Sequence, residues 1–202
     1  TTSVYDSKHI EGRLIDETFA TLDYSSEDNV NSSETYGKRK AECERILTNS
    51  ELNYTILRPS LVYGKYDSTD RFYYWLYNVH QQLDLIIPKT DDITFSITYV
   101  KDLINTINTL LSIEAKPSIY NVITKTSTSI TEIVNKLQKL LNKSSKVYEF
   151  CPDLLRKAGL KEWVDIPLWL PNNDYNCSNK RIIDELNIGS YDYDNSIKET
   201  IH

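Results

Sequence analysis

Apolar and polar residues follow two periods along the chain, and these periods predict strands and helices in alternation. Short apolar or alternating runs between turn residues predict strands at residues 53–58, 94–100, 118–123 and 146–150. Helical spacing and end signals predict helices at residues 34–47, 70–82, 102–113, 129–141, 151–158, 180–186 and 195–201. Because strands alternate with helices, the pattern favours an α/β fold with a largely parallel sheet.

Local signals mark several of these boundaries. Pro59 stops the strand before it, since proline donates no backbone hydrogen bond. Ser129 and Glu132 form a capping box at a helix start, and Asp102 is a candidate N-cap for the helix at 102–113. Gly159 ends a short helix.

The first 33 residues differ from the rest of the chain. Residues 1–4 predict the end of a buried strand, and residues 5–33 are polar, acidic and without clear period, which predicts a long loop. The chain contains no Met and opens inside the expected strand. We therefore expect residues upstream of Thr1 to be missing.

Composition narrows the class of protein. Apolar residues make up 40% and charged residues 26% of 202 positions, which are globular values. The net charge of -6 argues against nucleic acid or an anionic membrane as a partner. No apolar run approaches the roughly 20 residues that span a bilayer. Three Cys and three His without ligand spacing predict neither a metal site nor disulfides, and a reducing cytoplasmic location fits.

The central candidate for chemistry is Tyr36 with Lys40, a Tyr-x-x-x-Lys spacing. The spacing alone carries little weight, because the chain holds 15 Tyr and such a pair is expected by chance. On a helix, however, both residues share one side with Cys43 and Leu47, so the pattern predicts that this side faces inward. Lys40 then either extends to solvent or sits at a cleft beside Tyr36. In a cleft its ammonium would stabilise the phenolate, and the pair could exchange a proton with a substrate.

Two flanking segments give this pair a context. Residues 1–5 (Thr-Thr-Ser-Val-Tyr) place small hydroxyl residues at an expected strand end, and residues 57–64 (Leu-Arg-Pro-Ser-Leu-Val-Tyr-Gly) run from a strand into a turn. With residues 98–103 and 120–122, these segments resemble, in order, the extended short-chain dehydrogenase/reductase (SDR) family, whose members include NAD-dependent epimerases and dehydratases. The resemblance spans nearly the whole chain.

The resemblance implies an NAD(P)-dependent reductase or epimerase that transfers hydride to or from a hydroxyl or carbonyl substrate. Tyr36 would be the general acid/base, and Lys40 would hold the nicotinamide ribose and stabilise the Tyr36 phenolate. Thr1 would hydrogen-bond the substrate oxygen, with Thr2 as the alternative if the register shifts by one. The departure at Thr2 and Ser3, where the 4,6-dehydratases carry Asp-Glu, disfavours dehydration.

The resemblance also assigns binding residues. Pro59 and Ser60 would lie along the nicotinamide, and Tyr63 would pack beneath the site. On the substrate side, Arg71 could clamp a carboxylate or phosphate, although a surface arginine beside an aromatic core is the alternative. The stretch at 163–171 would wall a pocket, meet a second subunit, or simply pack in the core.

The same resemblance implies a division of the chain. Residues 1–66 would be the C-terminal part of a Rossmann-like cofactor domain. Residues 67–202 would form mainly a smaller mixed α/β substrate-binding region, with residues 94–123 returning to the Rossmann sheet.

The five glycines form no glycine-rich phosphate loop, so we expect the N-terminal half to be absent and this fragment alone to be inactive. NAD and NADP stay equally open. Family members often pair through the Tyr-x-x-x-Lys helix, which makes a homodimer a reasonable expectation. Two alternatives remain: a non-catalytic SDR-scaffold protein for cofactor sensing or interaction, and a plain α/β interaction module.

Overall fold

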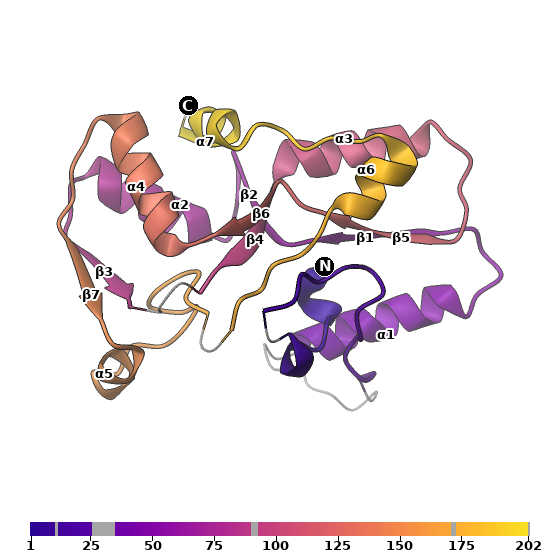
Figure 1. The fold of residues 1–202 in the computed structure, drawn as a ribbon, viewed down its shortest axis with the longest axis horizontal. Helices are drawn as coiled ribbons and strands as arrows, with labels where there is room; N and C mark the ends of the chain where they lie inside the picture. The colour runs from indigo at the N-terminus through magenta and orange to yellow at the C-terminus, as the bar shows by residue number, and fades with distance from the viewer. Residues whose placement is uncertain (11, 26–34, 90–92, 171–172, 202) are drawn as a thin grey trace.

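The computed structural model describes residues 1–10, 12–25, 35–89, 93–170 and 173–201 (Figure 1). Strands and helices alternate along it, and neighbouring strands pair mainly in parallel, so the fold is α/β as the sequence predicts. The strands are β1 (Thr55–Pro59), β2 (Leu61–Tyr63), β3 (Leu85–Pro88), β4 (Phe95–Tyr99), β5 (Ser118–Val122), β6 (Lys125–Thr128) and β7 (Val147–Phe150).

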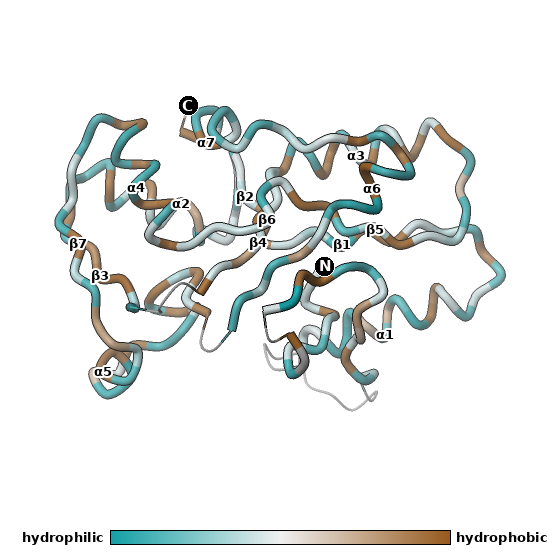
Figure 2. The backbone as a smooth tube through the Cα atoms, viewed as in Figure 1, coloured by the Kyte–Doolittle hydropathy of each residue, from teal (hydrophilic) through white to brown (hydrophobic). Residues whose placement is uncertain are grey.

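The helices occupy the segments that the periodicity predicts. They are α1 (Tyr36–Thr48), α2 (Arg71–His80), α3 (Val100–Leu111), α4 (Ile130–Leu141), α5 (Pro152–Lys157), α6 (Lys180–Leu186) and α7 (Tyr193–Ile201). The Ser129 side chain accepts a hydrogen bond from the Glu132 N–H, as a cap does. Teal and brown alternate along α3 and α4 in Figure 2, which is the mark of amphipathic helices.

The strand pairs define three small sheets. β1 pairs in parallel with β5, and β3 pairs in parallel with β7. β4 pairs in parallel with β2 on one side and antiparallel with β6 on the other. Figure 1 shows the β1–β5 pair between α1 on one side and α3 and α6 on the other. The other end of the molecule holds α2, α4 and the β3–β7 pair.

Two sequence predictions about local structure are wrong. Residues Thr2–Val4 form a 3-10 turn rather than a strand end, because the Thr1 side chain accepts from the Ser3 N–H and Tyr5 N–H closes onto the Thr2 carbonyl. Asp102 does not cap α3, which begins at Val100. Its carboxylate instead accepts bonds from the Thr124 hydroxyl and the Tyr191 N–H inside the fold.

The predicted loop at 5–33 contains one further 3-10 turn, Ser7–His9, within its described part; residues 11 and 26–33 lie outside the described residues. The strands β2, β3 and β6 are not predicted by the periodicity. Each is three or four residues long, which is too short for a period of two to stand out.

Candidate active site

Helix α1 carries Tyr36 and Lys40, and its buried face is set by small residues. A Cβ at Gly37 would lie 2.3 Å from the Ser3 carbonyl oxygen, so the turn at residues 2–4 packs directly on the helix backbone. Ala41, one turn later, is buried. This close approach is possible only because neither residue has a large side chain.

The prediction that Tyr36, Lys40, Cys43 and Leu47 face inward is therefore wrong. Tyr36 is 41% exposed and Leu47 38%, and Lys40 and Cys43 are exposed too. The buried face, formed by Gly37, Ala41 and the half-buried Glu44, is rotated by about 100°, one residue, from the predicted stripe. Hydrophobic periodicity misplaces it because its members are small or charged.

Lys40 nevertheless lies beside Tyr36. Its Nζ is 5.7 Å from the centroid of the Tyr36 ring, one helical turn away. An ammonium at this distance attracts both the ring face and a phenolate oxygen. The spacing thus produces the neighbouring pair that proton exchange would need.

Tyr36 opens onto a cavity of about 940 Å3. The structure brings six of the predicted site residues to its wall; these are Thr1, Thr2, Tyr36, Pro59, Ser60 and Arg71. Lys40 does not line the cavity; its side chain is exposed on α1, one turn from Tyr36. Trp163, from the apolar stretch at 163–171, lines the cavity as well, whereas Pro171 lies outside the described residues.

Ser60 sits where the chain changes partner. The residues before it pair with β5, and those after it pair with β4, both in parallel. The Ser60 N–H donates to Thr98 Oγ1 at 3.0 Å, and the Ser60 hydroxyl donates to the Ser96 carbonyl at 2.7 Å. These bonds hold Pro59 and Ser60 in the cavity wall at the carboxyl end of β1, and α/β sheets place ligands outside the carboxyl ends of their parallel strands.

Two tyrosines of the cavity wall, the buried Tyr5 and the half-buried Tyr175, were not singled out by the sequence. Tyr175 donates from its hydroxyl to the Thr2 carbonyl, and Tyr5 donates to Asn121 Oδ1 at 2.7 Å. Burial raises the pKa of Tyr5 to about 12 and also raises the pKa of Tyr175. Both phenols therefore stay protonated at neutral pH and act as fixed donors.

Tyr175 reaches the cavity through pairing that no local pattern reveals. Its N–H donates to the Thr94 carbonyl at 2.8 Å, and its own carbonyl accepts from the Ser96 N–H at 3.0 Å. The segment around Tyr175 thus pairs with the start of β4. Leu170, from the predicted stretch at 163–171, lines the cavity too. The other wall residues, to which the sequence assigned no role, are Ser3, Ser7, Leu22, Gly37, Arg39, Leu61, Val62 and Phe95.

The charge of the wall contrasts with that of the whole chain. Arg39 and Arg71 line the cavity, and none of the described lining residues is Asp or Glu, although the net charge is -6. Arg71 Nε donates to Thr69 Oγ1 at 3.0 Å, and no carboxylate in the described part of the chain pairs with Arg71. A wall of hydroxyls with the Arg71 cation suits a polar, negatively charged ligand.

Tyr63, predicted to pack beneath the site, is 2% exposed and stacks on Phe72 with ring centroids 5.0 Å apart. Within the described residues, no group of three or more His, Cys, Asp or Glu is arranged to hold a metal ion. No helix in the described part is long and apolar enough to cross a bilayer.

Comparison with known proteins gives the following matches. Residues 1–122 match the NAD dependent epimerase/dehydratase family. No curated protein matches the sequence. A solved structure of UDP-glucuronic acid 4-epimerase from Bacillus cereus in complex with NAD is 18% identical, with a TM-score of 0.70; the match covers 100% of this chain and 58% of that one.

Two further solved structures share the fold. UDP-N-acetylglucosamine 4-epimerase from Bacillus cereus is 13% identical with a TM-score of 0.68, over 100% of this chain and 61% of that one. The dTDP-glucose 4,6-dehydratase of Streptomyces venezuelae, with NAD bound, is 16% identical with a TM-score of 0.70, over 99% of this chain and 56% of that one. The chain thus spans less than two thirds of each.

Proposed function

Because the chain belongs to the NAD dependent epimerase/dehydratase family, we propose that it forms the substrate-facing part of an NAD(P)-dependent oxidoreductase or epimerase. The observation that carries the proposal is the single cavity that joins Tyr36 of α1, Thr1, and Ser60 at the strand switch. These three segments are far apart in the sequence, so their convergence is a property of the fold.

In this proposal Tyr36 is the general acid/base. Its phenol faces the cavity, and the Lys40 ammonium 5.7 Å from its ring stabilises the phenolate. Thr1 holds the substrate oxygen between itself and Tyr36, with Thr2 as the alternative. When bound, the nicotinamide would accept and return a hydride at the substrate carbon.

Part of the cavity wall fits the nicotinamide end of the coenzyme. Pro59 and Ser60 line the cavity, whereas Lys40, which we propose binds the ribose, is exposed beside Tyr36 and does not itself line it. None of the five glycines builds a phosphate loop, so we infer that this chain alone binds coenzyme weakly and is inactive alone. We propose residues 1–66 as part of the cofactor domain and 67–202 as mainly the substrate region, with 94–123 returning to the cofactor sheet.

We infer that the substrate is a small hydroxyl-bearing anion. Arg71 would bind its carboxylate or phosphate, since the described cavity wall holds no competing acid. The similar structures include proteins named for UDP-sugars and dTDP-glucose, and we propose a nucleotide sugar as the first candidate. The exposed Ile46 and Leu47 on the outer side of α1 support a homodimer through that helix.

Coenzyme binding tests the proposal directly. NADH and NADPH are titrated against the longest natural form of the protein by tryptophan fluorescence, in parallel with the present chain. We expect Lys40→Met to weaken binding, and Tyr36→Phe to keep binding while abolishing conversion of UDP-glucuronic acid or UDP-glucose. Lys38→Met, an exposed lysine on the same helix, is the matched control. If the intact protein binds neither coenzyme, it is a non-catalytic scaffold of the same family.

A further inference from the structure

An ion pair behind the cavity joins α1 to β1. Arg58 is 3% exposed, and its Nε lies 3.1 and 3.2 Å from the two carboxylate oxygens of Glu44, while its Nη2 lies 2.6 Å from Glu44 Oε2. This is a two-pronged contact, the strongest form of an arginine–carboxylate pair. Arg58 directly precedes Pro59 and Ser60 in the sequence, and Glu44 lies one turn after Lys40 on α1.

Arg58 is itself held in place on its other side. Its guanidinium carbon lies 4.7 Å from the centroid of the Tyr5 ring, and the Tyr5 hydroxyl donates to Asn121 Oδ1 on β5. The arginine is therefore fixed between α1, the turn at the start of the chain and the neighbouring strand. It cannot leave Glu44 without opening this buried contact.

Glu44 has a second cation within reach. Lys40 is four residues earlier on α1, the spacing at which helix side chains form ion pairs. Yet Lys40 contacts the Tyr36 ring, and among the residues that the structure describes it pairs with no carboxylate.

We propose that Arg58 is a positioning residue for Lys40: by holding the Glu44 carboxylate inside the fold, it leaves the Lys40 ammonium to Tyr36. This rests on the proposed function, in which the Lys40 charge serves Tyr36. Without Arg58, the half-buried Glu44 would turn to Lys40, the nearest cation on its own helix, and neutralise it. The buried Arg58–Glu44 pair thus keeps the Glu44 carboxylate away from the Lys40 ammonium, which in this proposal acts on Tyr36.

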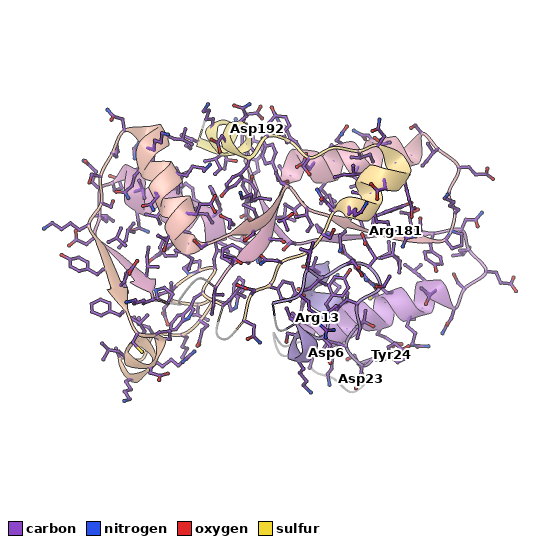
Figure 3. The ribbon with its side chains drawn as sticks, viewed as in Figure 1. Asp6, Arg13, Asp23, Tyr24, Arg181 and Asp192 are labelled. Carbon is purple, nitrogen blue, oxygen red and sulfur yellow. The ribbon has the colours of Figure 1, made fainter. Side chains whose placement is uncertain are left out.

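The test follows the titration of Tyr36 in the full chain. The protein is labelled with 3-fluorotyrosine. Fluorine NMR follows each tyrosine with pH, and Tyr36→Phe identifies the resonance of Tyr36. The variants are Lys40→Met, Arg58→Met, Glu44→Gln and the Arg58→Met/Glu44→Gln double variant. Glu185→Gln, in the exposed Arg181–Glu185 pair on α6, is the control; Figure 3 labels Arg181 there.

The proposal predicts opposite behaviour from the two halves of one ion pair. Lys40→Met and Arg58→Met should each raise the Tyr36 midpoint by about half a pH unit, the effect of one unit charge at this distance in water. Glu44→Gln should not raise it, because Lys40 stays free. The double variant should return to the wild-type midpoint, since Glu44 is no longer there to capture Lys40.

A pair that acts on Tyr36 only through its own charges would also raise the midpoint in Arg58→Met and lower it in Glu44→Gln. The Lys40→Met/Arg58→Met double variant separates the two cases. If Arg58 acts by keeping Lys40 free, Arg58→Met adds nothing to the rise caused by Lys40→Met, and a further rise in this double variant would overturn the proposal. If Arg58→Met does not fold by circular dichroism, Arg58→Lys replaces it, with a smaller rise expected because lysine cannot hold the carboxylate with two prongs. An unchanged midpoint in that variant contradicts the proposal equally.

The experiment distinguishes a failure of the Lys40–Tyr36 coupling from a failure of the proposed role of Arg58. If Lys40→Met leaves the Tyr36 midpoint unchanged, the coupling of Lys40 to Tyr36 that the proposed function requires is absent, and both fall. If Lys40→Met raises the midpoint and Arg58→Met does not, only the role of Arg58 is wrong.

Discussion

The two sides of the cavity are built on different physical principles. In the described part of the chain, the side formed by α1, residues 1–10 and residues 12–24 packs around seven buried residues, among them Ala41 and Cys177, and is joined by the Glu44–Arg58 pair. The other side, formed by α2 and β4 with α4 packed on α2, packs around twenty described buried residues, including Trp75 and Trp169. The first depends on close backbone contact and directional bonds, and the second on buried apolar area.

This difference predicts how each side responds to change. An apolar core loses stability in proportion to the area and volume removed, whichever residue supplies it. The α1 side has a small core and depends on a few directional contacts. When one of these contacts is removed, α1 can shift, because few other contacts oppose the movement. Residues that set geometry should therefore cluster on the α1 side, and residues that set stability on the α2 side.

The largest effect is expected from Trp75→Ala on the apolar side. Trp75 is 0% exposed, and its indole N–H donates to the Pro167 carbonyl at 3.2 Å. Truncation should lower the free energy of unfolding by about 3–5 kcal/mol. Urea unfolding followed by circular dichroism measures it, with the exposed Tyr73→Ala of the same helix as the control. Equal losses in both variants would refute the distinction between buried and exposed faces of α2.

Gly37→Ala should destabilise the side of the cavity that α1 forms. The added methyl would lie 2.3 Å from the Ser3 carbonyl and 2.7 Å from Leu22 Cδ1, so the helix must shift, at a cost of about 1–3 kcal/mol. Hydrogen exchange should rise in α1 while α2 and α4 stay protected. Gly189→Ala is the matched control, because nothing lies within 4 Å of its Cβ. Uniform exchange changes across all three helices would mean that the two sides are one unit.

Arg71→Gln should weaken ligand binding with little effect on folding. Arg71 begins α2 and lines the cavity that Tyr36 of α1 also lines. In the proposed function it binds the anionic group of the nucleotide sugar, so loss of this charge-assisted bond should lower the affinity for the proposed ligand about tenfold, with UDP-glucuronic acid as the probe. Fluorescence of the cavity residue Trp163 reports binding, and Arg181→Gln on α6 is the control. Unchanged affinity would remove Arg71 from the substrate site.

A smaller, pH-dependent effect is expected at Asp102, on α3. Burial raises the pKa of this carboxyl, and the bonds from Thr124 and the Tyr191 N–H oppose the rise. With the folded-state pKa above the unfolded value, the folded state binds more protons, so this group favours folding less as pH rises above about 4. The stability of wild type relative to Asp102→Asn should therefore fall between pH 3 and 7. Thermal unfolding across this range checks the slope, and a rise would contradict the cause.

Comparison of prediction and structure shows where local patterns suffice. Helix α6 has the predicted bounds, and Ser129 caps α4, because propensity and capping depend on neighbours in sequence. The resemblance of residues 1–5, 36–40 and 57–64 to one family indicated which segments would meet. Their convergence on one cavity agrees with that indication, although the roles of the individual residues stay predictions.

Local patterns fail where the deciding partner is far away in the chain. Tyr175 reaches the cavity because its backbone pairs with Thr94 and Ser96 at the start of β4, some 80 positions earlier. Asp102 leaves its expected cap position because Thr124 and Tyr191 bind it. No sequence window contains both partners, so no periodicity could have found them.

The sequence by itself determined the α/β alternation, most helix ends and the nearness of Tyr36 to Lys40, because those depend on contacts within a turn or two. Only the tertiary structure decided which face of α1 is buried and which cation Glu44 binds. A small-residue face and a buried ion pair have no hydrophobic signature. Their energy comes from a backbone and an arginine that other segments bring into place.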